Sequence, residues 1–197
     1  MKAVPKAEGP TNGLPTTESF ASFDRAIDAF FEAHLRGRPS LDVLMYTASA
    51  AGDHSMIWLA LSGLKGWRTG HGYKPLLRAG MAFGAESLLV NGLVKAAFRR
   101  QRPRSNEPRP LPLRVPRTSS FPSGHASSAF FAAALLRDRS SWPFYYALAA
   151  IVASSRAHVR IHHASDVVAG AALGAVLGEL TRCAFPLMAP PAETGPR

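Results

Sequence analysis

The hydrophobic positions of this chain fall into one amphipathic segment followed by five largely apolar ones. In residues 20–35, aromatic and aliphatic side chains recur every three or four positions and face Asp, Arg and Glu. This period predicts an amphipathic helix that ends at Pro39. Because its polar face carries both signs of charge, two placements stay open: the helix lies in a membrane interface, or it packs on the domain.

The apolar segments cover residues 41–64, 75–98, 123–136, 141–155 and 165–185. Asp42 and the triplet Gly52-Asp53-His54 interrupt the first segment, and a polar turn at residues 65–74 separates it from the second. No stretch alternates with the period of a strand. The sequence therefore predicts an all-α fold, a bundle of about five apolar helices plus the N-terminal amphipathic helix.

The apolar segments suit a membrane only in part. A spanning helix needs about 20 mostly apolar residues, and the uninterrupted runs in this chain are shorter, as in a buried core helix. Gly170, Gly174 and Gly178, by contrast, have the spacing that lets membrane helices pack closely. We expect a multi-pass protein of the inner (plasma) membrane with short, imperfect spans.

The chain ends differ in composition from the centre. Residues 1–19 are rich in Pro, Thr and Gly and lack the apolar region of a signal peptide, so we expect a flexible tail. Residues 20–185 have the length of one domain with a full core. Residues 186–197 are rich in Pro, and we expect a disordered C-terminal tail.

The net charge of +10 comes mainly from arginine and indicates an anionic partner. Aromatic residues are not interleaved with the basic ones in the way that stacks bases, so we expect no nucleic acid. A single cysteine, Cys183, excludes an intrachain disulfide and a thiolate metal cluster. The irregular segment at residues 99–121 holds arginines that are either solvated loop charges or contacts to lipid head groups: Arg99, Arg100, Arg104, Arg109, Arg114 and Arg117.

The sequence Ser-Ser-Phe-Pro-Ser-Gly-His at residues 119–125 joins this segment to the third apolar helix. Ser123 is a favoured helix cap, and Gly124 allows a close approach to the backbone. The N–H groups and the dipole of a helix start attract an anion. His125 adds a group that moves a proton near neutral pH. The turn alone therefore leaves two interpretations open: a phosphate site, or a capped helix whose His125 is an ordinary surface residue.

Two other stretches carry groups that suit the same phosphate. Lys95 precedes Arg102-Pro103, and Ser155-Arg156 precedes His162 and Asp166. If the apolar segments alternate in direction, these stretches and the start of the third segment emerge on one side of the bundle. We therefore expect the three stretches to meet.

The residue types match phosphoryl transfer. Lys95, Arg102 and Arg156 neutralise the charge of a transferring phosphoryl group, and Ser123 with the N–H groups near Gly124 completes the cradle. Asp166 follows His162 by four residues, so on a helical turn it accepts a hydrogen bond from one ring nitrogen while the other attacks phosphorus. His125 is then left to protonate the departing oxygen.

The three stretches resemble the motifs of the type 2 phosphatidic acid phosphatase (PAP2) family. The resemblance implies a helical phosphatase that needs neither metal nor cofactor and works through a phosphohistidine on His162. It implies a phosphorylated lipid or isoprenoid as substrate and a phosphate held by Lys95, Arg102, Ser123, Gly124 and Arg156. The chain is also similar to small actinobacterial members of the family, a group that includes decaprenylphosphoryl-phosphoribose phosphatases.

Several alternatives stay open. A vanadate-dependent haloperoxidase uses the same cradle in related folds, and a non-catalytic membrane protein that binds phospholipid needs only part of it. A metal site built from His158, His162, His163 and Asp166 is disfavoured, because its spacing matches no common zinc signature and its neighbours are basic. Asp53 and His54 are interpreted as a structural feature, either a satisfied polar pair or a helix end, in preference to a substrate contact. Glu86 is interpreted as the partner of an arginine.

The distribution of Lys and Arg indicates which side of the membrane the motif stretches face. In the alternating arrangement the N-terminus and most of the basic residues lie on the side of the motifs. Because positive loops favour the cytoplasm, we expect the active site to face that compartment.

Overall fold

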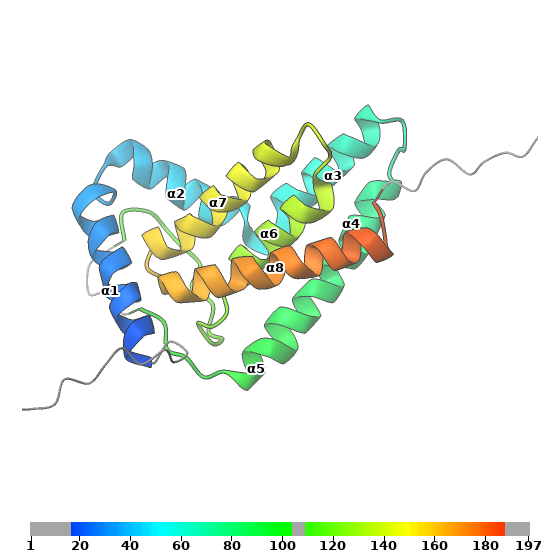
Figure 1. Ribbon diagram of the computed structural model, residues 1–197. Helices are drawn as coiled ribbons and strands as arrows, with labels where there is room; N and C mark the ends of the chain where they lie inside the picture. Colours follow the sequence, from blue (N-terminus) through cyan, green and yellow to red (C-terminus); the bar gives the residue numbers. More distant parts are fainter. Residues whose placement is uncertain (1–16, 104–108, 188–197) are drawn as a thin grey trace, which may run out of the picture.

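The computed structural model describes residues 17–103 and 109–187, and all regular structure within these ranges is helical, as predicted (Figure 1). The helices, in chain order, are α1 (Thr17–His34), α2 (Pro39–Ala51), the 3₁₀ turn η1 (Asp53–Ser55), α3 (Met56–Arg68), α4 (Lys74–Ser87), the π-helix η2 (Leu88–Val94), α5 (Lys95–Ala97), α6 (Gly124–Leu136), α7 (Trp142–His158) and α8 (Ala164–Ala184).

Helix α6 forms the centre of the bundle and contacts α3, α4, α7 and α8 (Figure 1). Its residues are mostly small or apolar and nearly all are buried, as expected for a helix that is hydrophobic on every side. The three glycines of α8 face the backbone of α6 at Ser123, Ser127 and Phe131. The close helix packing predicted from the glycine spacing is therefore confirmed.

The first apolar segment is not one helix, contrary to our expectation. It divides into α2, which contacts α7, and α3, which contacts α4. At the break, His54 and Ser55 have φ of 52° and 59°, in the left-handed region that side chains rarely occupy. Such conformations persist only where the surroundings fix them, and they are common at functional sites.

The second apolar segment forms an almost continuous helical column from α4 through η2 to α5 (Figure 1). The π-helical turn in its middle carries Asn91. Turns of this type interrupt α-helices mostly at functional positions. The column ends just after Lys95, where the chain enters the irregular segment.

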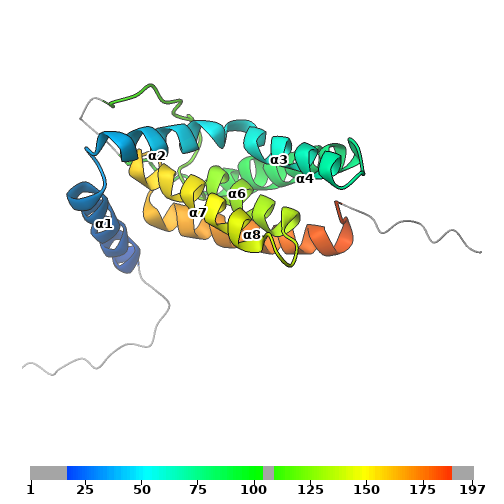
Figure 2. The same ribbon diagram turned by 90° about the horizontal axis from the view of Figure 1, so that it is seen from above.

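Helix α1 lies across the end of the bundle where α7 ends and α8 begins (Figures 1 and 2). Asp24 is only 7% exposed and accepts hydrogen bonds from the backbone N–H and the hydroxyl of Ser165. Packing on the domain is therefore observed, although Phe20, Phe23 and Phe30 remain exposed. The helix begins at Thr17, earlier than predicted, and residues 1–16 lie outside the described ranges.

The C-terminal boundary also differs from the prediction at residue 186. The carbonyl of Pro186 accepts a hydrogen bond from Arg78, and Leu187 is buried against the core. These two residues thus belong to the packed domain. The rest of the predicted tail lies outside the described part of the chain.

Among the described helices, α8 alone is long and apolar enough to cross a bilayer, and α6 is apolar but shorter. Large apolar side chains are nevertheless exposed on the outer faces of several helices, among them Val43, Met56, Leu77, Met81, Leu88, Leu93, Val176 and Leu180. The multi-pass arrangement predicted from the sequence stays a prediction.

Candidate active site

The three predicted motif stretches meet at one end of the bundle, as the alternation of segments requires. The loop after α5 supplies Arg102, whose Nη1 lies 3.0 Å from Nε2 of His162 in the turn between α7 and α8. The backbone N–H of Ser123, at the start of α6, donates to the carbonyl of Asp166 at 3.0 Å. Segments far apart in the sequence therefore form one site.

His162 is held as a neutral imidazole with Nε2 unprotonated. The side chain is 3% exposed, and this burial lowers its pKa far below the ordinary value. Nδ1 lies 2.7 Å from the carbonyl oxygen of Ser120, which only accepts, so Nδ1 carries the proton. Nε2 is then unprotonated and accepts from Arg102, which is the form a nucleophile requires.

Asp166 orients His162 through an intermediate residue, not by the direct bond we predicted. Its Oδ2 lies 3.7 Å from Nδ1 of His162, too far for a hydrogen bond, and accepts instead from the Ser120 hydroxyl at 2.6 Å. The reason is that α8 begins at Ala164, so His162 precedes the helix and does not share its face. Asp166 fixes Ser120, and the Ser120 carbonyl fixes the imidazole.

The same carboxylate also caps α8 and is tied to α1. Oδ2 of Asp166 accepts from the backbone N–H of His163 at 2.9 Å, and Oδ1 pairs with Arg100 at 2.7 Å. The other Arg100 nitrogen pairs with Asp24 of α1 at 2.5 Å. Arg100 therefore links the N-terminal helix to the residues that hold His162, a connection that the motif pattern did not indicate.

Two guanidinium groups near His162, one buried and one half-buried, have buried N–H groups without a partner. Arg156 is 1% exposed; its Nη1 donates to the hydroxyl of Ser49, whereas its Nε and Nη2 have no partner within the described ranges. Nε of Arg102 is likewise buried without a partner there. Leaving such donors unpaired costs about 1–3 kcal/mol each, more for charged groups. An anion bound between the two arginines removes that cost.

Arg102 is positioned by the loops on either side of it. Its Nη1 donates to the carbonyl of Ile161 at 3.0 Å, and its Nη2 donates to the carbonyls of Thr118 and Ser119 at 3.2 Å. These bonds fix the plane of the guanidinium beside His162. A planar fork held in this way suits the oxygens of a phosphate.

The other residues predicted to hold phosphate are Lys95, Ser123 and Gly124. Lys95 is buried at the end of the helical column and shares a groove with Arg102. The hydroxyl of Ser123 accepts from Ala126 N at 3.4 Å, which confirms the predicted cap. A Cβ at Gly124 would overlap the side-chain oxygen of Asn91, so the predicted close approach is confirmed, and the approaching group is Asn91.

His125 pairs with Asp53 across the break between α2 and α3. Its Nε2 lies 2.8 Å from Oδ1 of Asp53, and a Cβ at Gly52 would come within 3.0 Å of the ring. His54 is exposed, and its Nε2 lies 2.7 Å from Arg114. Asp53 and His54 therefore do not pair with each other, but they form the turn that ends α2, so the helix-end interpretation is confirmed. The signal that pointed to Asp53 was a carboxylate inside an apolar run.

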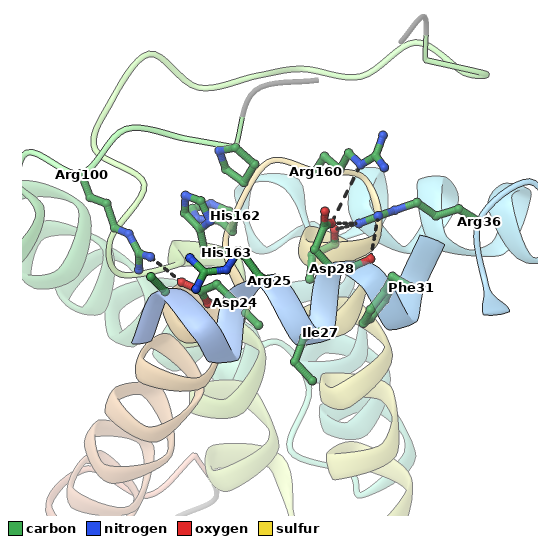
Figure 3. A pocket seen from close by; sticks show the side chains of 14 residues that line it. Asp24, Arg25, Ile27, Asp28, Phe31, Arg36, Arg100, Arg160, His162 and His163 are labelled. Carbon is green, nitrogen blue, oxygen red and sulfur yellow. Dashed lines mark hydrogen bonds and ion pairs between the residues drawn. The ribbon is translucent and has the colours of Figure 1, made fainter. Parts of the chain in front are cut away.

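A pocket of about 370 Å³ lies between α1 and the site (Figure 3). Its lining includes His162, His163 and Arg100. On the side of α1, Arg36 and Arg160 converge on Asp28 and Glu32, at distances of 2.5–3.9 Å. The positive charges at this rim are thus neutralised by acidic residues of the same chain.

The other polar residues considered as metal ligands or catalytic groups contact residues of the same chain. His158 Nε2 lies 2.7 Å from Asp42, and His163 faces the carbonyl of Gln101. No group of three or more His, Cys, Asp or Glu is placed to hold a metal within residues 17–103 and 109–187. Glu86 accepts from the hydroxyl of Ser127 at 2.5 Å, so the expected arginine partner was wrong.

Comparison with known proteins agrees with this geometry. Residues 75–187 match the PAP2 superfamily. The chain belongs to the PAP2 superfamily. It is 33% identical over 156 residues to the decaprenylphosphoryl-5-phosphoribose phosphatase of Mycobacterium tuberculosis H37Rv, covering 79% of this chain and 86% of the relative. The enzyme of the same name from Mycolicibacterium smegmatis is 33% identical over 143 residues, or 71% and 76% of the two chains.

The PAP2 fold is also found by structural similarity. The crystal structure of a transmembrane PAP2-type phosphatidylglycerolphosphate phosphatase from Bacillus subtilis matches with a TM-score of 0.60 and 23% identity, over 83% of this chain and 90% of that one. Membership of the PAP2 superfamily makes the chain a phosphatase. The relatives are phosphatases by name, which favours hydrolysis over the haloperoxidase and non-catalytic alternatives.

Proposed function

We propose that this PAP2 phosphatase hydrolyses a phosphomonoester on a membrane lipid or isoprenoid, and that the preferred substrate is a lipid-linked sugar phosphate. The names of the mycobacterial relatives support the substrate class. The observation that carries the reaction is that Arg156 and Arg102 keep buried N–H donors without a partner, and that Arg102 lies beside the unprotonated Nε2 of His162. This arrangement suits a bound phosphate facing a nucleophile.

The proposed reaction has two steps. Nε2 of His162 attacks phosphorus, the bond from phosphorus to the leaving oxygen breaks, and His125 gives its proton to that oxygen. Water then attacks the resulting phosphohistidine and passes a proton to His125, and inorganic phosphate departs from a regenerated His162. Lys95, Arg102, Arg156, Ser123 and the N–H groups at Gly124 stabilise the charge on the phosphoryl oxygens.

The surroundings of the two histidines support these roles. Phosphorylation at Nε2 leaves a positive imidazole whose remaining proton stays bound to the Ser120 carbonyl. Asp166, 3.7 Å from that nitrogen, stabilises the positive charge without a direct hydrogen bond. Asp53 lies in direct contact with His125, at 2.8 Å, and its negative charge favours the protonated form of His125 against the opposing effect of burial.

A membrane location follows from the same proposal. The exposed apolar side chains on the outer faces of α2, α3, α4 and α8 suit contact with lipid, and α8 is long enough to span a bilayer. The irregular basic segment and α1 then lie at the membrane surface. We infer a multi-pass inner-membrane protein whose site faces the cytoplasm, because most basic residues lie on that side.

The test of function is phosphate release by the purified full chain in detergent, with a chelator present throughout. The panel contains phosphatidic acid, phosphatidylglycerophosphate, a polyprenyl diphosphate and a polyprenyl-phosphoryl-ribose 5-phosphate. We expect release from the last to be fastest, a loss of at least about 10³-fold in His162→Ala, and no loss in His71→Ala, a change at a turn far from the site. Release that survives in His162→Ala, or strong inhibition by chelator, overturns the mechanism.

Orientation has its own test. Ser105 is replaced by Cys in a Cys183→Ser background, and labelling with a membrane-impermeant thiol reagent is compared in intact and permeabilised cells. A cytoplasmic site predicts labelling only after permeabilisation. Labelling of intact cells overturns that orientation and leaves the chemistry untouched.

A further inference from the structure

A basic groove of about 760 Å³ runs from the candidate phosphate cradle between the end of the helical column and residues 116–119. Its lining residues include Asn91, Phe98 and Gln101, and it contains no Asp or Glu. The cations of the groove are Lys95, Arg99, Arg100, Arg102 and Arg117. Such a concentration of positive charge attracts anions.

The five cations of the groove differ in whether another residue of the chain binds them. Lys95 and Arg102 belong to the proposed cradle, and Arg100 is neutralised by Asp24 and Asp166. Arg99 and Arg117 are exposed, and within residues 17–103 and 109–187 neither side chain has an ion pair or hydrogen bond. The groove therefore holds two arginines beyond those that one phosphate needs.

The other pocket of the same end shows the contrast (Figure 3). There, Arg36 and Arg160 pair with Asp28 and Glu32 of α1, so these two cations are neutralised by carboxylates of the same chain. Among the described residues that line the groove there is no such carboxylate. The difference indicates that the partner of Arg99 and Arg117 comes from outside the described chain.

We propose that Arg99 and Arg117 form a second anion site, which binds a phosphodiester group of the substrate while the cradle holds the monoester. The inference rests on the proposed function and narrows its substrate class to lipids with a second phosphate beyond the scissile one. Arginine suits this role because its planar fork binds phosphate oxygens in pairs.

The position of the groove fits the leaving group. Asn91 lines the groove and lies against Gly124, the residue before His125. His125 protonates the departing oxygen in the proposed reaction, so the leaving group lies on that side and extends over Asn91 into the groove. A sugar joined to lipid through a phosphodiester then places its second phosphate near Arg99 and Arg117. Phosphatidic acid has no such group and gains nothing from them.

A phosphodiester near the groove has a second possible source, the head groups of anionic membrane lipids. A continuous connection with Lys95 and Arg102 favours the substrate, because a contact to bulk lipid needs no opening toward the cradle. The two sources predict different kinetics. A substrate site affects only substrates that carry the second phosphate, whereas a membrane site affects every substrate in anionic vesicles and none in neutral micelles.

The experiment compares Arg99→Gln, Arg117→Gln and the double variant with wild type in neutral detergent micelles. For polyprenyl-phosphoryl-ribose 5-phosphate we expect KM to rise about tenfold in each single variant and further in the double one, with kcat nearly unchanged. For phosphatidic acid we expect no change. The matched control is Arg139→Gln, an exposed arginine in the turn between α6 and α7 at the other end of the bundle.

Equal effects on both substrates, or none on either while wild type is active, overturn the second anion site and leave the proposed function standing. If the Arg99 and Arg117 variants lose activity only in vesicles of phosphatidylglycerol, and not in vesicles of phosphatidylcholine, the two arginines bind membrane lipids instead of the substrate. Inactivity of wild type on every substrate overturns the proposed function separately.

If wild type is inactive on every substrate, the second anion site is tested by ligand binding instead of by catalysis. Dissociation constants are measured for ribose 5-phosphate and ribose 1,5-bisphosphate, which differ by one phosphate. We expect wild type to prefer the bisphosphate by about tenfold or more, and the double variant to lose that preference while ribose 5-phosphate binds as before. Equal affinity of wild type for the two compounds overturns the proposal.

Discussion

Asp53 and His125 lie 2.8 Å apart, across 72 residues of sequence, because the chain breaks its first apolar segment at the point where α6 begins. The break places a carboxylate next to the histidine that follows Ser123-Gly124. Two consecutive residues in left-handed conformation, His54 and Ser55, make the turn possible. The strained conformation is thus tied to one specific contact.

We expect Asp53→Asn to lower kcat by about 10- to 100-fold with little change in KM. The amide preserves the shape of the side chain but lacks the charge that stabilises the protonated His125. For the same reason the alkaline limb of the kcat profile moves to lower pH. Initial rates between pH 5 and 9 measure both effects.

Two further variants separate positioning from folding at this turn. Asp53→Glu restores part of the lost kcat, because the carboxylate is retained. His54→Gln changes an exposed neighbour in the same turn and leaves the profile as in wild type. If Asp53→Asn lowers only the thermal stability and leaves the pH profile of kcat unshifted, Asp53 does not position His125.

The buried imidazole of His162 predicts a pH-dependent stability. Its pKa is lowered in the folded state by burial, whereas an unfolded histidine titrates near 6.5. The unfolded chain therefore binds more protons as the pH falls through that value, and the folded state loses stability. Between pH 7.5 and 5.5 we expect the Tm of wild type to fall more than that of His162→Gln.

The control for that measurement is His71→Gln, which removes a histidine at the turn between α3 and α4, far from the site. Its Tm is expected to follow wild type across the same range. A Tm of His162→Gln that falls in parallel with wild type contradicts a neutral, buried His162.

The sequence was sufficient for the class of fold and for the meeting of the three motifs. Hydrophobic segments predict helices directly. Because consecutive helices alternate in direction, Lys95, Ser123, His162 and Asp166 must lie at the same end of the bundle, whatever the details of packing. Ser123 was identifiable as a cap because capping depends on neighbours in sequence. Periodicity and capping are local properties of the sequence, and the side on which the motifs lie follows from the alternating direction of the helices.

Residues that act through tertiary contacts were not predictable. Asp53, Ser49 and Arg100 each reach a motif residue from an element distant in sequence, and no spacing rule relates them to it. The bond expected between His162 and Asp166 failed for a related reason. A difference of two residues in where α8 begins decides whether His162 and Asp166 share a helical face, and helix boundaries are not fixed by periodicity alone.

Helix α1 is expected to depend on Asp24. This buried carboxylate accepts hydrogen bonds from Ser165 and pairs with Arg100, which in turn holds Asp166. Asp24→Asn weakens both contacts, so hydrogen exchange across residues 17–34 increases and kcat falls by a few fold. Glu18→Gln, an exposed change in the same helix, should leave exchange unchanged. Unchanged protection in Asp24→Asn contradicts an anchoring role.

The spacing of α6 and α8 gives the last prediction. A Cβ added at Gly174 would overlap the backbone carbonyl of Ser127, which a rigid helix cannot move aside. We expect Gly174→Ala to reduce the free energy of unfolding by about 1–3 kcal/mol, because the two helices must separate. Activity falls with it, since the same interface holds Ser123 against Asp166.

Gly84→Ala is the matched control, because a Cβ there has no atom within 4 Å. Alanine in a helix is more favourable than glycine by about 0.5–1 kcal/mol, so this variant should be as stable as wild type or slightly more so. Thermal melts in one detergent compare the three proteins. Equal melting temperatures for Gly174→Ala and Gly84→Ala would mean that α6 and α8 do not approach closely enough for Ser127 to exclude a methyl group.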